Sequence, residues 1–266
     1  MTRRSIILAG VLAALACFAV GQAARADALD DIRQAKTIRI ATDLGLPPYS
    51  MTDANMQPTG SDIETARLLA RDFGVQLALV PTIAASRIPM LLTGKADLVI
   101  ATLSITPDRA KVIDFSVPYA TLRTVIAGIR GIKVETIADL TGKTVGVTRG
   151  TPNDLYLSET AKGVNVLRYE DDATTAEAFA SGQVDLIATA ELLLPPIAQK
   201  NTSRQIEIKY IIEAYKLAIG VKKGEPRLLQ AVDSWVRTNL KNGKLNDIYK
   251  RFHGTDLPEV ILKEGR

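Results

Sequence analysis

The sequence predicts an α/β protein made of two related lobes, and three observations lead to this expectation. From residue 38 onward, short apolar runs alternate with amphipathic stretches of helical period, which is typical of helices packed on a largely parallel sheet. The segments GKADLVIAT from Gly94 and GQVDLIATA from Gly182 carry Gly, Asp and Leu at matching positions. Two extended stretches, 119–126 and 211–221, suggest that the chain passes twice between the lobes.

One lobe is therefore expected to be inserted into the other. We predict that lobe 1 is discontinuous and comprises residues 27–120 and 217–266, and that lobe 2 comprises residues 121–216. The 266 residues are 47% hydrophobic and 23% charged, which is enough apolar material for a core in each lobe.

The first 26 residues are predicted to be a signal peptide. Arg3 and Arg4 form a basic start, residues 6–20 form an apolar stretch, and Ala24-Arg25-Ala26 has the small-residue pattern of a cleavage site. Because the apolar stretch is short for a membrane span, we expect cleavage after Ala26 and export to the periplasm.

Composition without the signal excludes several functions. Cys17 is the only cysteine and lies inside the signal, so lipidation at Cys17 stays open, and the mature chain holds no thiol for disulfide or metal chemistry. Removing the three arginines of the signal takes the 33 basic residues to 30 against 29 acidic ones, so no nucleic-acid partner is indicated. His253 is the only histidine, and we predict no metal site and no cofactor.

The first elements of lobe 1 are predicted from their caps and periodicity. Ser61 with Glu64 three residues later has the form of a capping box, which would begin a helix that Gly74 ends. Around this helix the sequence predicts strands over 38–41, 75–80 and 98–101 and a short helix over 86–93.

After the third strand come residues suited to binding a carboxylate. Thr102 and Ser104 supply hydroxyl groups at a strand end. Thr106 followed by Pro107 is typical of a helix N-cap and first helical position, and Arg109 lies in that first turn. The sequence therefore predicts an anion site at this helix N-terminus.

Lobe 2 is predicted to repeat this design. Thr151 followed by Pro152 has the same cap pattern, and Asp154 would complete a capping box. The expected strands of lobe 2 are 144–147, 164–169 and 185–189, with a helix over 174–180; the C-terminal part adds a strand over 217–221 and helices over 227–240 and 244–252.

The motifs resemble those of a known family. TDLGLPPYS from Thr42, GSDIETA from Gly60, SRIPMLLTGKADLVIATLSITPDR from Ser86 and DFSVPYA from Asp114 are similar to the polar amino-acid-binding proteins of ABC importers, solute-binding protein family 3. The resemblance implies a type II periplasmic binding fold, with two lobes on a two-strand hinge that close on a ligand. It also implies an ABC transporter permease as partner, and we expect a monomer.

The resemblance assigns the ligand contacts residue by residue. Arg109 matches the arginine that pairs with the ligand carboxylate, for which its planar fork is suited. Thr102 and Ser104 match hydrogen-bonding positions, and Gly150 and Thr151 approach from lobe 2. N-capping alone also explains Thr151.

The ligand ammonium lacks its usual partner. The family usually has an Asp at the position of Ala190. Glu191 is adjacent, and Asp171 and Asp172 lie in a loop that reaches the ligand in relatives, so one of these carboxylates is expected to take over. A helix N-cap role explains Asp172 as well.

The side-chain end of the site also departs from the family. Leu46 and Ser61 stand where relatives often carry aromatic residues that sandwich the ligand. Arg87 resembles the arginine of members that bind acidic amino acids, although a surface role is equally compatible. Asp43, at the end of the first strand, completes the candidate contacts.

Two functions remain open from the sequence. The leading hypothesis is a binding protein that captures an amino acid or a related small carboxylate ligand for an importer. The alternative is a periplasmic enzyme of the same fold, similar to cyclohexadienyl dehydratase, in which Glu191 or Asp172 would be the general acid.

Overall fold

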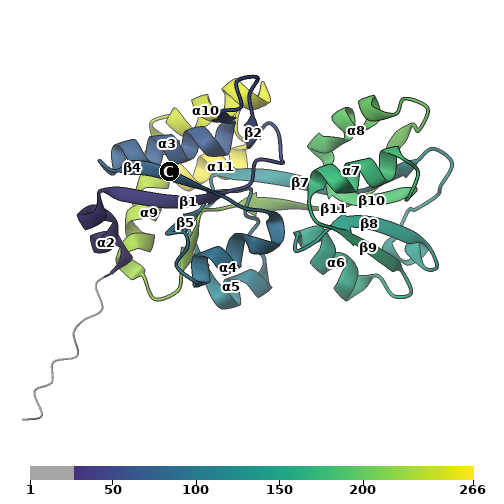
Figure 1. The fold of residues 1–266 in the computed structure, drawn as a ribbon, viewed down its shortest axis with the longest axis horizontal. Helices are drawn as coiled ribbons and strands as arrows, with labels where there is room; N and C mark the ends of the chain where they lie inside the picture. Colours follow the sequence, from purple (N-terminus) through teal and green to yellow (C-terminus); the bar gives the residue numbers. More distant parts are fainter. Residues whose placement is uncertain (1–26) are drawn as a thin grey trace, which may run out of the picture.

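The computed structural model describes residues 27–266, which form two α/β lobes joined by two long strands (Figure 1). The predicted signal peptide with its cleavage after Ala26, and Cys17, lie outside the described residues. No helix within residues 27–266 is long and apolar enough to cross a membrane.

Lobe 1 contains a five-stranded sheet in the order β4-β1-β5-β12-β6. Strand β1 is parallel to β4 and β5, whereas β12 is antiparallel to β5 and β6. The strands are β1 (Thr37–Thr42), β4 (Gln76–Pro81), β5 (Leu98–Val99), β6 (Ile113–Phe115) and β12 (Gly220–Lys222). Because β12 comes from the C-terminal part of the chain, this sheet combines residues from both sides of lobe 2.

Lobe 2 repeats the same strand pattern. Its sheet has the order β11-β7-β10-β8-β9, in which β9, β8 and β10 are parallel and β7 is antiparallel to β10. The strands are β7 (Ala120–Ile129), β8 (Thr144–Thr148), β9 (Asn165–Tyr169), β10 (Leu186–Ala190) and β11 (Ile206–Leu217). The two matching segments, from Gly94 and Gly182, lead into β5 and β10, the central strand of each sheet.

Strands β7 and β11, here called the crossing strands, run between the lobes. They pair in antiparallel fashion from Ala120 opposite Leu217 to Ile129 opposite Ile206. The start of β7 and the end of β11 are fixed to lobe 1 by hydrogen bonds. Tyr119 N–H donates to Leu217 O (2.9 Å), and the Tyr49 hydroxyl donates to Thr121 O.

Helices cover both sheets. In lobe 1, helix α9 buries Trp235, whose indole N–H donates to Asp72 Oδ2 (2.9 Å) at the end of α3. The helices of lobe 1 are α2 (Ala28–Ala35), α3 (Ser61–Asp72), α4 (Arg87–Leu92), α5 (Pro107–Val112), α9 (Pro226–Lys241), α10 (Lys244–His253) and α11 (Glu259–Leu262). Those of lobe 2 are α6 (Pro152–Thr160), α7 (Asp172–Ala180) and α8 (Leu194–Lys200).

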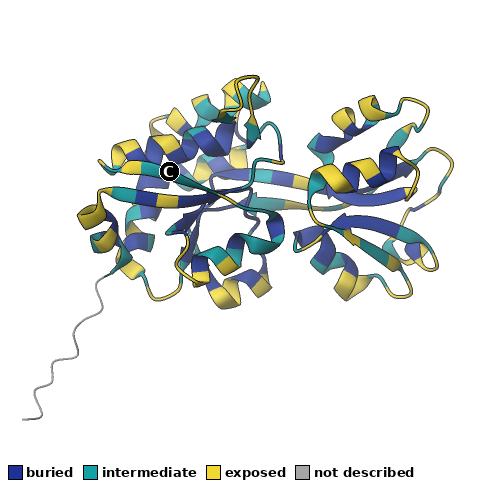
Figure 2. Ribbon diagram, viewed as in Figure 1, coloured by how far each residue is buried: buried dark blue, intermediate teal, exposed yellow. Residues whose placement is uncertain are grey.

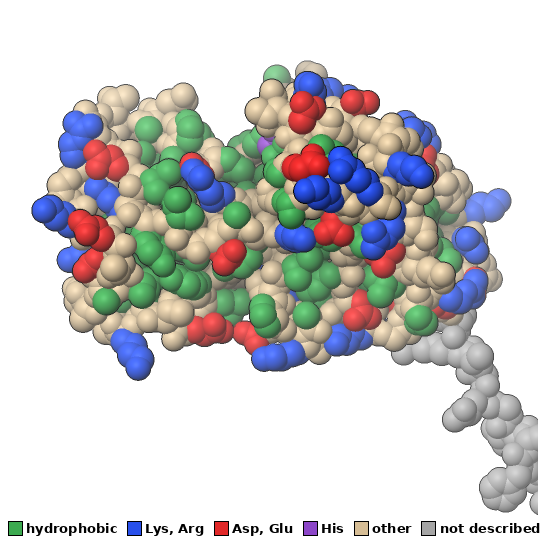
Figure 3. Space-filling view, turned by 180° about the vertical axis from the view of Figure 1, so that it is seen from behind, with side chains coloured by type: hydrophobic (Ala, Val, Ile, Leu, Met, Phe, Trp, Pro, Cys, Tyr) green, Lys and Arg blue, Asp and Glu red, His purple; other side chains and the backbone are tan. Residues whose placement is uncertain are grey.

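Burial follows the predicted faces of the elements. The inner parallel strands β1, β5, β8 and β10 are mostly buried, whereas the edge strands β4 and β9 are half-buried or exposed. The helices are buried toward the sheets and exposed on their outer faces (Figure 2). On the face shown in Figure 3, basic and acidic side chains are interspersed over both lobes.

Both predicted Thr-Pro caps are confirmed. Thr106 accepts a hydrogen bond from the backbone N–H of Arg109 (3.3 Å), and Thr151 accepts one from that of Asp154 (3.3 Å), each with proline next in the chain. The Asp154 carboxylate accepts from the N–H of Gly150 (3.0 Å) instead of completing a box with Thr151.

Three local predictions are wrong. Gly60, not Ser61, caps α3, because φ of Gly60 is 124° and a Cβ there would lie 2.2 Å from Tyr49 O. The predicted strand 98–101 ends at Val99, since Thr102 turns the chain into a left-handed conformation. The predicted strand 217–221 is divided between β11, which ends at Leu217, and β12.

We expect Asp72→Ala to destabilise lobe 1. The change leaves the indole N–H of Trp235 without its acceptor, and a buried donor that loses its partner costs about 1–3 kcal/mol. The side-chain amide of Asn239 loses a second, longer bond to Asp72 (3.4 Å) but keeps Trp235 O as acceptor. Urea unfolding followed by the fluorescence of Trp235, the only tryptophan, measures the loss.

Asp53→Ala on the exposed 53–57 turn serves as the control for removal of an acidic side chain. An Asp72→Ala protein as stable as the wild type would mean that this hydrogen bond does not hold α9 against α3.

Candidate functional site

A cavity lies where the carboxyl ends of the parallel strands of the two sheets meet. It has a volume of about 30 Å³, and residues of both lobes form its wall. Most lining residues follow β1, β4, β5, β8 and β9 or end β10, which is where α/β sheets usually bind ligands, and Leu122 and Thr124 lie in β7. They are Leu46, Arg87, Thr102, Ser104, Leu122, Thr124, Thr151, Pro152, Asn153, Asp172 and Ala190.

Six residues that the sequence analysis selected line this cavity together. They come from both lobes, which is the arrangement that a closing site requires. The six are Leu46, Arg87, Thr102, Ser104, Thr151 and Asp172. A larger groove of about 520 Å³ lies at the opposite ends of the lobe 2 strands, around Lys143 and Asp185, and none of the predicted site residues lines it.

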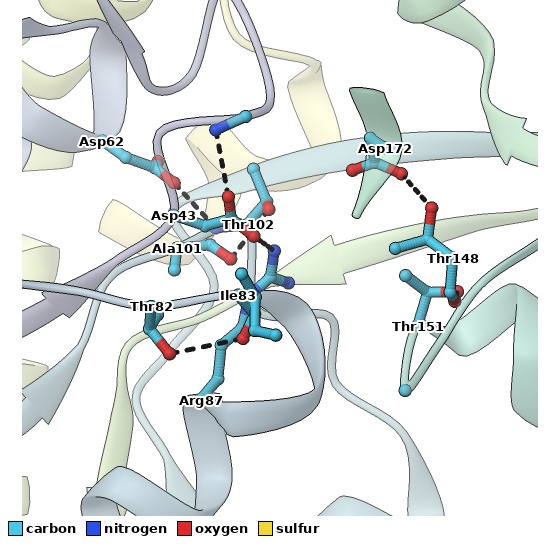
Figure 4. Close-up of polar contacts among 12 residues, drawn as sticks. Asp43, Asp62, Thr82, Ile83, Arg87, Ala101, Thr102, Thr148, Thr151 and Asp172 are labelled. Atoms are coloured by element: carbon cyan, nitrogen blue, oxygen red, sulfur yellow. Dashed lines mark hydrogen bonds and ion pairs between the residues drawn. The ribbon is translucent and has the colours of Figure 1, made fainter. Parts of the chain in front are cut away.

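Asp62 holds the backbone of the site in an unusual conformation. Thr102 has φ of 47°, which a β-branched residue seldom adopts, and its N–H donates to Asp62 Oδ2 (2.7 Å; Figure 4). The other oxygen of Asp62 accepts from the Tyr119 hydroxyl (2.8 Å). Complete burial raises the pKa of Asp62 to about 6, against the hydrogen bonds from Tyr119 and Thr102 that lower it.

Arg87 and Asp43 form an ion pair on the lobe 1 side of the cavity (Figure 4). Arg87 Nη2 donates to Asp43 Oδ2 (2.6 Å), and the second oxygen of Asp43 accepts from the N–H of Gly45 (3.0 Å). The side chains of Arg87 and Asp43 are 4% and 13% exposed, so Arg87 is a buried cleft residue and not a surface residue.

Asp172 is the carboxylate that lobe 2 contributes to the cavity. Its Oδ1 accepts from the Thr148 hydroxyl (2.6 Å; Figure 4). The Thr148 hydroxyl also pairs with the hydroxyl of Thr175 (2.8 Å). Burial raises the pKa of Asp172, while the Thr148 hydrogen bond and the charge of Arg87 lower it. Helix α7 is capped by Asp171, with Thr174 completing a capping box, so Asp172 is free of the capping role.

Arg109 lies behind Ser104, at the contact between the lobes. Its guanidinium donates to Ser104 O (2.9 Å) and, across the lobe boundary, to Gly150 O (3.0 Å). Burial, with the charge of Arg87, lowers the pKa of Arg109 to about 9. Within residues 27–266 no acidic side chain forms an ion pair with this buried cation.

The turn at Gly150 brings lobe 2 against lobe 1. Gly150 has φ of 72°, and a Cβ there would lie 2.8 Å from the Cα of Ala85 in lobe 1. The hydroxyl of Thr151 donates to Thr148 O (2.7 Å) besides capping α6. Thr151 therefore lines the cavity, but its hydroxyl group is already hydrogen-bonded within lobe 2.

Three buried polar atoms of cavity residues have no hydrogen-bond partner among the described residues. They are Arg87 Nε, Ser104 Oγ and Asn153 Oδ1. A buried polar atom without a partner costs free energy, so these three atoms are candidates for contact with a polar ligand.

Five candidates from the sequence do not line the cavity: Asp43, Ser61, Arg109, Gly150 and Glu191. Ser61 and Glu191 have other partners. The Ser61 hydroxyl pairs with His253 Nε2 (3.0 Å) under α10, where His253 stacks on Tyr249 with ring centres 3.9 Å apart. Glu191 forms a two-pronged ion pair with Arg123 on β7. Their side chains are thus committed to structural contacts.

Sequence reasoning missed Asp62 and Asn153. Asp62 stands at the second position of a predicted helix, where an acidic residue is ordinary, and nothing local signals its contact with Thr102 forty positions later. Asn153 directly follows the Thr151-Pro152 cap, and a search for polar residues one turn into each capped helix would have found it.

Comparisons with known proteins agree with this geometry. The family model of the bacterial extracellular solute-binding proteins, family 3, matches residues 38–255. The L-cystine-binding protein TcyJ of Escherichia coli (strain K12) is 28% identical over 236 residues, covering 86% of this chain and 87% of TcyJ.

Two solved structures resemble most of the chain. An ancestral arginine-binding protein bound to arginine has a TM-score of 0.76 and 29% identity and covers 82% of this chain and 98% of its own. The ancestral amino acid-binding protein AncCDT-1, a precursor of cyclohexadienyl dehydratase, has a TM-score of 0.75 and 30% identity, with 85% and 99% covered.

Replacing Asp62 by Asn should change how stability depends on pH. Asn keeps an acceptor for Thr102 and a group that can pair with Tyr119. Because the pKa of Asp62 is raised from 3.8 to about 6, its contribution to folding is fully present below about pH 4 and is lost as the pH rises through 6. Two pKa units correspond to about 3 kcal/mol. We therefore expect the difference in free energy of unfolding between Asp62→Asn and the wild type to increase in favour of the variant by up to about 3 kcal/mol between pH 4 and pH 7.

Urea unfolding at a series of pH values measures this difference. The exposed Asp53→Asn protein provides the control and should follow the wild type. A difference between Asp62→Asn and wild type that stays constant with pH would contradict the raised pKa.

Proposed function

Because the chain belongs to the bacterial extracellular solute-binding proteins, family 3, we propose that it captures an amino acid or an amino-acid-like carboxylate between its lobes and delivers it to the permease of an ABC importer. One observation carries this proposal. Arg109 is a buried cation without an acidic partner in the described chain, and it lies at the contact of two lobes.

A ligand carboxylate supplies the charge that Arg109 lacks. A guanidinium has five N–H donors in a planar fork, and Arg109 uses two of its nitrogens on the uncharged carbonyl groups of Ser104 and Gly150. We expect the carboxylate to replace Gly150 O as acceptor, since charge-assisted bonds are about twice as strong as neutral ones. The unpartnered Ser104 hydroxyl provides a further donor beside it.

We assign the ligand ammonium to Asp172. Ala190 lines the cavity where relatives use an Asp, and Asp172 lines the same cavity from the same lobe. The other two candidate carboxylates are engaged, Glu191 with Arg123 and Asp171 as the cap of α7. Thr148 orients Asp172 toward the cavity and stabilises its charged form.

Ligand contacts to both lobes would couple binding to closure. Ser104 and Arg87 line the cavity from lobe 1, and Thr151 and Asp172 line it from lobe 2. Arg109 is not a lining residue, but it lies at the lobe contact and reaches Gly150 O of lobe 2. Only a closed protein would make all of these contacts at once. The ligand then favours the closed state by its differential affinity for the two states. The crossing strands β7 and β11 would serve as the hinge.

Export and docking complete the proposal. The signal over residues 1–26 would direct the protein to the periplasm, where a monomer presents its closed lobes to the permease. The chain is a binding protein and not an enzyme, because its relatives are named for the amino acids that they bind. The dehydratase alternative is therefore not retained.

Arg109→Ala should abolish ligand binding without unfolding the protein. Loss of one partner of a buried ion pair costs about 3–5 kcal/mol, so we expect affinity to fall by more than about 100-fold. A thermal-shift screen of amino acids and small carboxylates identifies a ligand, and calorimetry then compares the variant with the wild type.

Arg71→Ala, an exposed arginine on α3, is the matched control. Undiminished affinity of Arg109→Ala for a ligand that the wild type binds would refute the carboxylate anchor.

Asp172→Asn should weaken binding of an α-amino acid far more than binding of its analogue without the amino group. Asn retains the shape and an acceptor for Thr148 but loses the charge that holds the ammonium. A selective loss of at least ~10-fold is expected, in line with the 1.5–3 kcal/mol of a hydrogen bond to a charged group.

Glu191→Gln tests the rejected candidate in the same assay. If Glu191→Gln shows the selective loss and Asp172→Asn does not, the ammonium assignment is wrong.

A further inference from the structure

Arg87 lines the cavity, and its ion pair with Asp43, which is not itself a lining residue, puts opposite charges side by side on the lobe 1 side. Their contact is 2.6 Å long, and solvent reaches only 4% of the Arg87 side chain. Asp43 is held in place from its other oxygen by the N–H of Gly45. The pair is thus fixed and internally neutralised.

Across the cavity, lobe 2 presents Asp172 and Asn153. Asp172 is close enough to the pair that Arg87 and Asp43 shift its pKa in opposite directions, Arg87 downward and Asp43 upward. A ligand between the lobes therefore meets the pair on one side and Asp172 on the other (Figure 4).

We propose that the Asp43–Arg87 pair selects ligands whose side chain is polar but carries no net charge, either an uncharged polar group or a group with one charge of each sign. This inference rests on the proposed function, because it concerns the part of the ligand beyond its carboxylate and ammonium groups.

A side chain with a single charge has to break the pair. A cationic ligand group can pair with Asp43 only if Arg87 is left buried without its counter-ion. An anionic ligand group can pair with Arg87 only if Asp43 is left unpaired. Removing one partner from a buried pair is strongly unfavourable, which corresponds to a penalty of roughly 100-fold in affinity. The site thus discriminates between ligands mainly by disfavouring those with a singly charged side chain.

A polar side chain without net charge leaves the pair intact and uses the atoms that lack partners. Arg87 Nε is a buried donor and Asn153 Oδ1 a buried acceptor, and both belong to cavity residues. A carboxamide, a ureido group or a zwitterionic head offers one acceptor and one donor and can satisfy both. An aliphatic side chain would leave both atoms unpaired.

Pairs of ligands that differ mainly in charge test the selection. Calorimetry on the wild-type protein compares glutamine with glutamate, asparagine with aspartate, and citrulline with arginine, within a thermal-shift panel of all protein amino acids and cystine. We expect the tightest ligand to have an uncharged polar or zwitterionic side chain, and its singly charged counterpart to bind at least ~100-fold more weakly.

Two variants should reverse the preference in opposite directions. Asp43→Asn releases Arg87 and should improve binding of the anionic member of a pair relative to the neutral one. Arg87→Met releases Asp43 and should do the same for the cationic member. Asp30→Asn, which removes an exposed ion pair with Arg227 on lobe 1, is the matched control and should leave the preference unchanged.

Each outcome decides the inference. A tightest ligand with a singly charged or an apolar side chain overturns it while leaving the proposed function standing. Binding of no amino acid or small carboxylate overturns the proposed function and this inference together. The ranking of ligand affinities for the wild-type protein tests the inference without any variant. The test therefore remains even if circular dichroism shows that a variant does not fold.

Discussion

Charge held away from water at the lobe boundary is the constraint on which the rest of the structure depends. Arg87 and Arg109 are each 4% exposed and Asp62 is fully buried, although burying a charge is costly unless a partner compensates it. Asp62 and Arg87 find partners within the chain, and Arg109 finds only carbonyl groups. Arg109 is therefore the buried charge for which we propose a ligand carboxylate as counter-ion.

Strand topology explains how these charges come together. In each lobe three parallel strands end at the same edge of the sheet, so residues far apart in sequence meet there. Because β7 and β11 connect the lobes, the two edges face each other across the cavity, and these strands are the hinge that we propose. In this arrangement lobe 1 supplies both guanidinium groups and lobe 2 supplies Asp172.

The sequence predicted most of the fold, because its signals are local. Apolar runs, glycine stops and the Thr106 and Thr151 caps depend on neighbouring residues alone, and these predictions hold. The local failures are element ends, at the cap of α3 and in the strands predicted over 98–101 and 217–221. The contacts that were missed are long-range. The pair of Asp43 and Arg87 joins positions 44 apart, and no periodicity reports such a contact.

The candidate site was predictable in outline and not in its details. Hydroxyl residues after predicted strand ends correctly indicated one wall of the cavity, because the carboxyl ends of parallel strands lie at the same edge of a sheet. Whether Glu191 or Asp172 turns inward depends on a competing partner, Arg123, which lies on a crossing strand. Ser61 was misplaced because its helix begins at Gly60, and this turns Ser61 toward His253.

The paired positions of Ala120 and Leu217 have a consequence for how such proteins diversify. Lobe 2 leaves lobe 1 and returns to it at neighbouring points, so two exchanges of DNA at these points would transplant it whole. Each lobe brings half of the binding residues, and a transplant would join the anion-binding half of one protein to the ammonium-binding half of another. New combinations of recognition can thus arise by recombination, without the loss of either folded half.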